Sequence, residues 1–150
     1  MEEGLTMLMF VDCEFNDFQG ELISMALVTI TGQEFYEVLE CKNPSPWVKD
    51  NVMPVLGKKA VSKTQFQQKL HQFLNQFDCV EIVADWPEDV AHFCQSLITG
   101  PGMRLNTPSL NISVVRFDAP SQQPHNALAD AKGMASFFLS NYLDRQIKSL

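Results

Sequence analysis

Two carboxylic acids, Asp12 and Glu14, stand two residues apart at the end of an apolar run from Met7 to Phe15. Residues two apart on a strand point to the same face of a sheet. Like charges held this close raise the cost of ionising each other. A divalent cation would compensate both charges, because hard cations prefer carboxylate oxygens. The alternative is that both acids lie in solvent at the end of the strand.

A second group of candidate residues lies near the carboxyl end of the chain. His125 stands at the expected junction of a loop and a helix, and Asp130 follows about one and a half turns into that helix. A histidine at such a junction is commonly a cap or a surface residue, whereas an acid among alanine and leucine residues is harder to explain structurally. The helix also carries three small residues that would let it approach a neighbouring element closely: Ala127, Ala129 and Ala131.

A third acidic group, from Asp85 to Asp89, follows a short apolar strand. Asp85 as N-cap, Pro87 in the first turn and Glu88 at the third helical position fit a capping box. That arrangement would place Asp89 one turn inside the helix, beside a strand end. Sheet enzymes tend to gather their sites at such strand ends.

These three segments need a fold that brings them together. Apolar and alternating patterns predict consecutive strands over residues 7–15, 21–30 and 34–39. Their short connections favour an antiparallel meander. Beyond a short helical turn within 47–55, helices and strands alternate: helix 64–77, strand 80–84, helix 88–98, strand 111–117 and helix 126–147. This order predicts an α/β fold, a mixed sheet flanked by helices.

The composition indicates one globular domain over residues 1–150, with 45% hydrophobic and 19% charged residues. Eleven Lys and Arg against 18 Asp and Glu give a net charge of −7. This charge disfavours a protein that coats duplex nucleic acid or binds an anionic membrane. An acidic protein can still bind nucleic acid when divalent ions in its site reverse the local charge.

Four cysteines form no C-x-x-C pair, so neither a zinc ribbon nor a redox motif is indicated: Cys13, Cys41, Cys79 and Cys94. We expect reduced and mostly buried thiols, with Cys94 on the apolar face of its helix. The first residues are acidic, and the first apolar run is interrupted by Asp12 and Glu14. We therefore expect neither a secretory signal nor a membrane span. The protein is expected to be cytoplasmic.

In this order, the three motifs resemble those of the DEDDh superfamily of 3′→5′ exonucleases, which includes ribonuclease T and oligoribonuclease. Asp12-Cys13-Glu14 matches the first motif, D-x-E, and His125 to Asp130 matches the third, H-x-x-x-x-D. The resemblance implies a ribonuclease-H-like fold. The second motif, N-x-x-F-D, is matched imperfectly: Asp85 takes the Asn place and Asp89 the ligand place, with Asp85 as the alternative ligand.

A closer resemblance is to a branch of short exoribonucleases known from mycobacteria. The shared features are Glu21 to Ser24, Glu34 to Tyr36, Trp47-Val48 and Met53-Pro54, and the resemblance extends over about residues 8–140. It favours RNA over DNA as the substrate. It also implies a homodimer, for which apolar residues on the last helix are candidates: Phe137, Phe138 and Tyr142.

The resemblance implies that two Mg²⁺ or Mn²⁺ ions are held by four acids: Asp12, Glu14, Asp89 and Asp130. His125 would act as general base toward the attacking water, and nucleoside 5′-monophosphates would leave from the 3′ end of a single strand. Aromatic or acidic neighbours would contact the terminal nucleotide, unless they belong to the core: Phe15, Trp47, Asp85 and Trp86. The alternatives are a DNA exonuclease with the same chemistry and a non-catalytic nucleic-acid-binding module.

Overall fold

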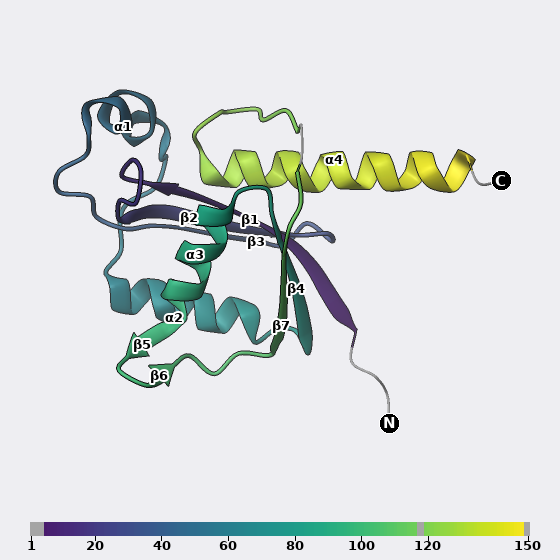
Figure 1. The fold of residues 1–150 in the computed structure, drawn as a ribbon, viewed down its shortest axis with the longest axis horizontal. Coiled ribbons are helices and arrows are strands. Elements are labelled where there is room, and N and C mark those ends of the chain that lie inside the picture. Colours follow the sequence, from purple (N-terminus) through teal and green to yellow (C-terminus); the bar gives the residue numbers. More distant parts are fainter. Residues whose placement is uncertain (1–4, 117–118, 149–150) are drawn as a thin grey trace.

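A mixed five-stranded sheet forms the centre of the protein in the computed structural model, which describes residues 5–116 and 119–148. The strands are β1 (Thr6–Phe15), β2 (Leu22–Thr29), β3 (Glu34–Val38), β4 (Cys79–Ala84) and β7 (Ser109–Val114). In the order β3-β2-β1-β4-β7, the first three strands are antiparallel, and β4 and β7 extend the sheet parallel to β1 (Figure 1). The expected meander and the expected mixed α/β sheet are both confirmed.

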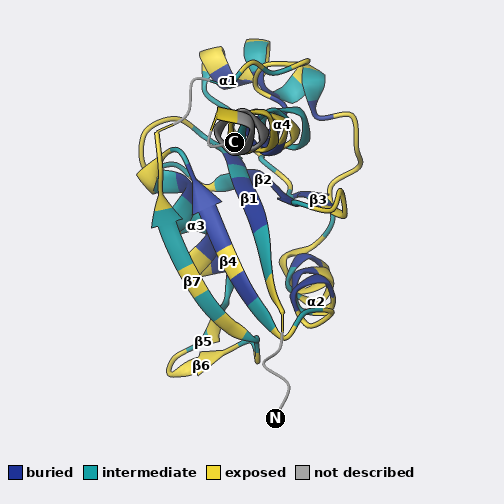
Figure 2. Cartoon of the chain, turned by 90° about the vertical axis from the view of Figure 1, so that its right-hand side faces the viewer, coloured by how far each residue is buried: buried dark blue, intermediate teal, exposed yellow. Residues whose placement is uncertain are grey.

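Helices cover both faces of this sheet. They are α1 (Pro46–Asn51), the 3₁₀ helix η1 (Met53–Val55), α2 (Lys63–Leu74), α3 (Pro87–Ser96) and α4 (Ala127–Lys148). α4 lies across one face, and α2 and α3 lie on the other (Figures 1 and 2). Among the described residues, no helix combines the length and apolarity needed to cross a membrane.

The middle of the central strand β1 is buried, from Met9 to Val11 and at Cys13, and is dark blue in Figure 2. Met9 and Val11 belong to the core beneath α2 and α3, whereas Phe10 packs with Ala127 and Ala131 of α4. Because side chains alternate along a strand, Asp12 and Glu14 extend the face of Phe10. The apolar face of β1 therefore ends in two acids at the point where α4 begins.

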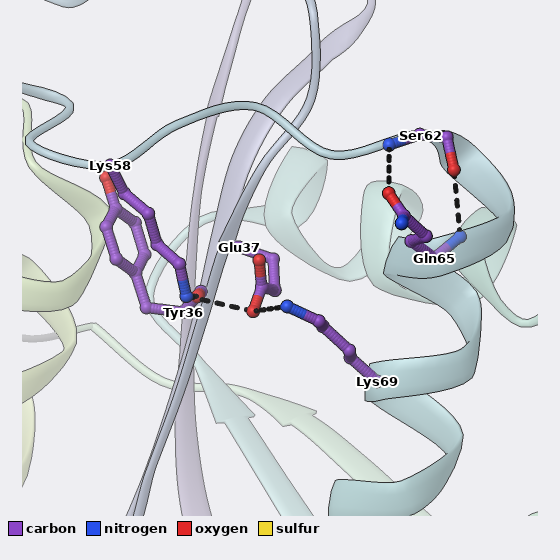
Figure 3. Close-up of polar contacts among 6 residues, drawn as sticks. All are labelled: Tyr36, Glu37, Lys58, Ser62, Gln65 and Lys69. Carbon is purple, nitrogen blue, oxygen red and sulfur yellow. Dashed lines mark hydrogen bonds and ion pairs between the residues drawn. The ribbon is translucent and has the colours of Figure 1, made fainter.

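A capping box and a buried ion pair fix α2 and the chain before it. The Ser62 hydroxyl accepts a hydrogen bond from the Gln65 backbone N–H (3.1 Å), and the Gln65 side chain accepts one from the Ser62 N–H (3.2 Å; Figure 3). The buried Glu37 carboxylate on β3 forms ion pairs with Lys58 and Lys69, at 2.9 and 3.2 Å between Nζ and Oε1. These contacts tie α2 and the segment after η1 to the edge of the sheet.

The observed elements differ from the predicted ones in several details. The helix expected to reach residue 77 ends at Leu74, and residues 98–104 form a small hairpin, β5 (Ile98–Gly100) with β6 (Met103–Arg104), that the sequence pattern did not reveal. The strand expected over 111–117 starts earlier and ends at Val114, and its expected last residue lies outside the described residues.

The expectation that the four thiols are mostly buried is wrong. All are free, but only Cys13 is buried and Cys94 is exposed. Cys94 follows the buried Phe93 in a ten-residue helix whose buried stripe is narrow, so it faces solvent.

Candidate metal centre

The parallel register between β1 and β4 brings the first two acids together. Phe10 pairs with Val83 in this ladder. Asp12 and Asp85 each lie two residues further along, at the carboxyl ends of adjacent parallel strands. Residues separated by 73 positions in sequence thus become neighbours at one edge of the sheet.

Asp89 joins them from the first turn of α3 and is itself buried. One of its carboxylate oxygens accepts a hydrogen bond from the backbone N–H of Cys13, at 3.3 Å between nitrogen and oxygen. The three acids Asp12, Asp85 and Asp89 each offer an oxygen within 4.8 Å of the others. Both candidates for the second-motif ligand therefore belong to the same group.

The prediction of a capping box at the start of α3 is wrong. α3 begins at Pro87, its N-cap is Trp86, and no side chain caps it. Asp85 instead stays at the end of β4, where its carboxylate joins the acidic group. Glu88, at the second helical position, accepts a hydrogen bond from the Trp86 indole N–H at 3.2 Å.

α4 contributes the last acid. Asp130 lies in its first turn, and Asp12, Glu14 and Asp130 form a second group whose oxygens lie within 4.8 Å of one another. Asn126 fixes this helix end: its side-chain oxygen accepts from the Ala129 N–H (2.9 Å), and its amide donates to the Val55 carbonyl (2.8 Å). η1 and the start of α4 are therefore held together beside the acids.

Burial and the neighbouring negative charges raise the pKa values of these carboxyl groups. Loss of water raises the pKa of Glu14 from 4.5 to about 8, and the charges of Asp130 and Asp89 add to the effect. Burial also raises the pKa of Asp89 to about 8, with the Asp85 charge as the next cause. The pKa of Asp12 is raised well above its ordinary value by burial first and then by its acidic neighbours.

Asp12 is the residue that the two acidic groups share. Its Oδ2 atom is buried and has no hydrogen-bond partner among the described residues. A buried oxygen without a partner is costly, and a bound cation would satisfy it. Two groups of carboxylate oxygens that share one residue could hold hard divalent cations.

His125 lies beside these groups but belongs to neither. It is exposed, it has a positive φ of 68°, and its charge and backbone N–H act to lower the pKa of Asp130, which burial raises. Its imidazole packs edge-on against the indole of Trp47, with 5.0 Å between ring centroids. Few non-glycine residues adopt positive φ, so the chain turns sharply just before α4. The expected position at a loop–helix junction is confirmed.

A cleft of about 400 Å³ opens over the acids of β1, β4 and α3. Three aromatic residues at this cleft are at least half exposed: Trp47 (51%), Trp86 (56%) and Phe18 (80%). Phe15 also lines the cleft, but it is half-buried and its ring packs at a tilt against His92, with 4.8 Å between ring centroids. Exposed aromatic faces beside a cleft are suitable platforms for stacking nucleobases.

The sequence interpretation missed Phe18, which sits on the tight loop between β1 and β2. Asp17 and Gln19 have positive φ values of 59° and 57°. A Cβ on Gly20 would lie 1.6 Å from the Asn16 carbonyl oxygen, so only glycine fits there. An aromatic residue between turn-forming residues was the available signal, because such a loop has no core in which to bury a ring.

Asn16 joins this loop to the segment that carries Trp47. Its side-chain oxygen accepts from the Ser45 N–H (2.9 Å), and its amide donates to the Asn43 carbonyl (2.9 Å). Ser45 in turn caps α1, on which Trp47 lies. Phe18 and Trp47 are thus attached to one connected rim of the cleft.

Neither a protein-family model nor a curated protein sequence matches this chain. The chemistry of the site is therefore the ground on which a function can be proposed. Segments from four parts of the chain bring five acids together, with a histidine and exposed aromatic rings beside them.

Proposed function

We propose that this protein is a divalent-metal-dependent 3′→5′ exoribonuclease with a ribonuclease-H-like fold. It removes nucleoside 5′-monophosphates from the 3′ end of single-stranded RNA. The observation that carries the proposal is the position of Asp12, which belongs to two groups of carboxylates and has a buried oxygen without a partner among the described residues. The resemblance of the three motifs to the DEDDh exonucleases supports the same reaction.

Asp12, Glu14, Asp89 and Asp130 would hold the ions, and Asp85 is near enough to join them. Two divalent ions, when bound, supply positive charge that neutralises the scissile phosphate and makes a water more acidic. The high pKa of Glu14 and the unpartnered oxygen of Asp12 fit this role, since both describe carboxylates that lack compensating charge. In a chain of net charge −7, such compensation is also needed before a phosphodiester can approach.

His125 is the proposed general base. It is exposed, and it lies close enough to the proposed ligand Asp130 to influence the pKa of that carboxyl group. The neutral imidazole would take a proton from the attacking water, and contact with Trp47 would restrict its orientation. A general base at this position typically contributes about 10²–10⁴-fold to the rate.

The aromatic rim supports a single-stranded substrate. Phe18, Trp47 and Trp86 present exposed faces around the cleft, and stacking on such faces requires bases that are not paired in a duplex. Ring stacking is tolerant of sequence and sugar, so a DNA exonuclease with the same chemistry is the second candidate. A non-catalytic binding module would not require several partly buried carboxylates so close together.

The decisive test uses single-stranded RNA and DNA with a 5′ fluorescent label, incubated with the purified protein in Mg²⁺. The proposal expects a ladder of 5′-labelled products and free mononucleotides, no cleavage of circular RNA, and loss of activity in EDTA. Asp12→Ala should abolish the ladder, whereas Asp50→Ala, an exposed acid on α1, serves as the matched control. Immediate mid-length fragments, or full activity of Asp12→Ala, would contradict the proposal.

A further inference from the structure

Two long segments of this chain contain basic residues but no acidic ones. Residues 51–77 contain four lysines, residues 90–117 contain two arginines, and neither segment contains Asp or Glu. All 18 acids therefore lie in the remaining 95 residues. Charge asymmetry of this kind marks separate surfaces for separate partners or separate parts of one ligand.

The fold brings parts of the two acid-free segments together on one side of the sheet, whereas Arg116 of the second segment lines a hollow with Phe137 and Phe138 of α4. The first contains α2, and the second contains most of α3 and the β5–β6 hairpin, which lie next to one another in Figure 1. The Gln67 side-chain amide joins them: it donates to the carbonyls of Ser96 (3.1 Å) and Ile98 (2.9 Å). A continuous acid-free surface thus runs from α2 to the hairpin.

Two hollows lie on this side of the molecule. The middle hollow, of about 570 Å³, is lined by residues that include Lys63, Gln67 and His92. The outer hollow, of about 810 Å³, lies between α2 and the hairpin and contains Gln67, His71 and Arg104. Because Gln67 lines both, the two hollows adjoin.

The middle hollow also adjoins the acidic cleft. His92 lines the middle hollow, Phe15 lines the acidic cleft, and their rings pack against each other at a tilt, with 4.8 Å between centroids. Gln19 of the middle hollow places its N–H 3.5 Å from a carboxylate oxygen of Glu88, which lines the cleft. The three hollows therefore follow one another, from the acidic cleft past the Phe15–His92 pair to the β5–β6 hairpin.

The cations of this surface differ in availability. Lys58 and Lys69 are occupied by the buried Glu37. Lys63 and Arg104 are exposed, and no carboxylate among the described residues lies within 4.0 Å of either nitrogen group. The middle hollow includes Glu21 and Glu40, whereas the residues that line the outer hollow include no acid.

We infer that the two outer hollows bind the 5′ portion of the single strand whose 3′ end enters the acidic cleft. This inference rests on the proposed function for the identity of the strand. Lys63 and Arg104 would contact backbone phosphates, because they are the Lys and Arg side chains among the residues that line the two hollows. The side-chain amides and hydroxyls of the hollows offer neutral hydrogen bonds to sugars and bases without selecting a sequence.

The test measures binding as a function of strand length. Fluorescein-labelled RNA of three nucleotides and of roughly 12 nucleotides, a length typical of single-strand grooves, is titrated by anisotropy in Ca²⁺ at several salt concentrations. Gel analysis verifies that the strand stays intact. The double variant Lys63→Gln, Arg104→Gln removes the two cations, and Lys132→Gln, Lys148→Gln makes the same charge change on α4, on the other face of the sheet.

We expect the native protein to bind the longer strand more tightly than the trinucleotide. The groove variant should weaken binding of the longer strand about tenfold at low salt and reduce the slope of log Kd against log salt by about 1.4, or about 0.7 per lost phosphate contact. The α4 variant should retain both the affinity and the slope. Thermal melting of both variants verifies folding.

Unchanged affinity and slope in the groove variant would overturn the groove assignment and leave the proposed nuclease function intact. Salt-dependent binding that the groove variant loses, in a protein without nuclease activity, would uphold the groove and refute the nuclease. An acidic peptide such as polyglutamate that binds as tightly as RNA, with the same loss in the groove variant, would assign the groove to an acidic protein and overturn the nucleic-acid strand.

Discussion

Replacing Glu14 by glutamine should stabilise the metal-free protein at high pH and leave it almost unchanged at low pH. Burial and the charges of Asp130 and Asp89 raise the pKa of Glu14 in the folded state from 4.5 to about 8. A raised carboxyl pKa contributes stability below the unfolded value, and this is lost as the pH rises through the folded value. The metal-free protein therefore loses stability between about pH 4 and pH 8.

The size of the effect follows from that difference in pKa. At 1.36 kcal/mol per pKa unit, moving from 4.5 to about 8 costs the folded state about 5 kcal/mol once Glu14 is ionised. An amide of the same shape carries no charge but still loses water on burial, so we expect a net gain of about 3–4 kcal/mol at about pH 9. For a chain of 150 residues, this corresponds to a rise in Tm of about 6–16 °C.

Thermal and urea unfolding in EDTA, at about pH 5 and about pH 9, would measure this gain. Glu81→Gln, the same substitution at an exposed position of β4, is the control and should change stability by less than about 0.5 kcal/mol at either pH. Mg²⁺ should then narrow the difference between the two proteins, because a ligand at 100 times its Kd stabilises the native protein by about 2.7 kcal/mol and the variant has lost a donor. Equal stabilisation at both pH values, or none at the higher one, would refute the account of crowded, ionised carboxylates.

Four further predictions concern activity and positioning. Asp89→Asn should abolish turnover and weaken metal binding measured by calorimetry, whereas Asp85→Asn should retain most activity; the opposite pattern would transfer the ligand role to Asp85. His125→Ala should lower kcat about 10²–10⁴-fold with metal and oligonucleotide binding nearly unchanged, and it should lack the acid limb of the native pH–rate profile at saturating metal; native turnover and profile would remove His125 from the mechanism. Phe18→Ala should raise KM for RNA about 5–150-fold, the equivalent of 1–3 kcal/mol of stacking, without changing Tm by more than a degree or two, because this side chain is 80% exposed; an unchanged KM would remove it from the binding surface. Asn126→Asp keeps the acceptor for the Ala129 N–H but places a carboxylate oxygen against the Val55 carbonyl; it should lower Tm and kcat together, and an unchanged kcat would show that this tether does not position α4.

Local sequence patterns were sufficient to predict the order of the main elements. The apolar run of β1 ending in Asp12 and Glu14, and the spacing of Phe66, Leu70 and Phe73 on α2, are periodic signals that burial of one face dictates. The alanines that let α4 lie close to the sheet could be identified in the same way, and Ala127 and Ala131 are fully buried. Each of these features depends on residues within about two turns of one another, so a local pattern encodes it.

The short hairpin and the start of α3 could not be predicted from such patterns. β5 and β6 have three and two residues, too few to show a period. Asp85 is an excellent cap by residue type, yet the chain keeps it at the end of β4, where the neighbouring acids lie. Local propensity was outweighed there by the tertiary position of a strand end.

The sequence by itself determined which side chains could bind a metal and on which elements they lie. Only the tertiary structure decided which acids meet: the parallel register sets Asp12 beside Asp85, and the start of α4 brings Asp130 to Glu14. It also decided that Trp47 and Phe18 share a rim, and that parts of the acid-free segments lie next to one another. The physical reason is that strand pairing and helix packing join residues far apart in sequence, and no local period records the partner that each will meet.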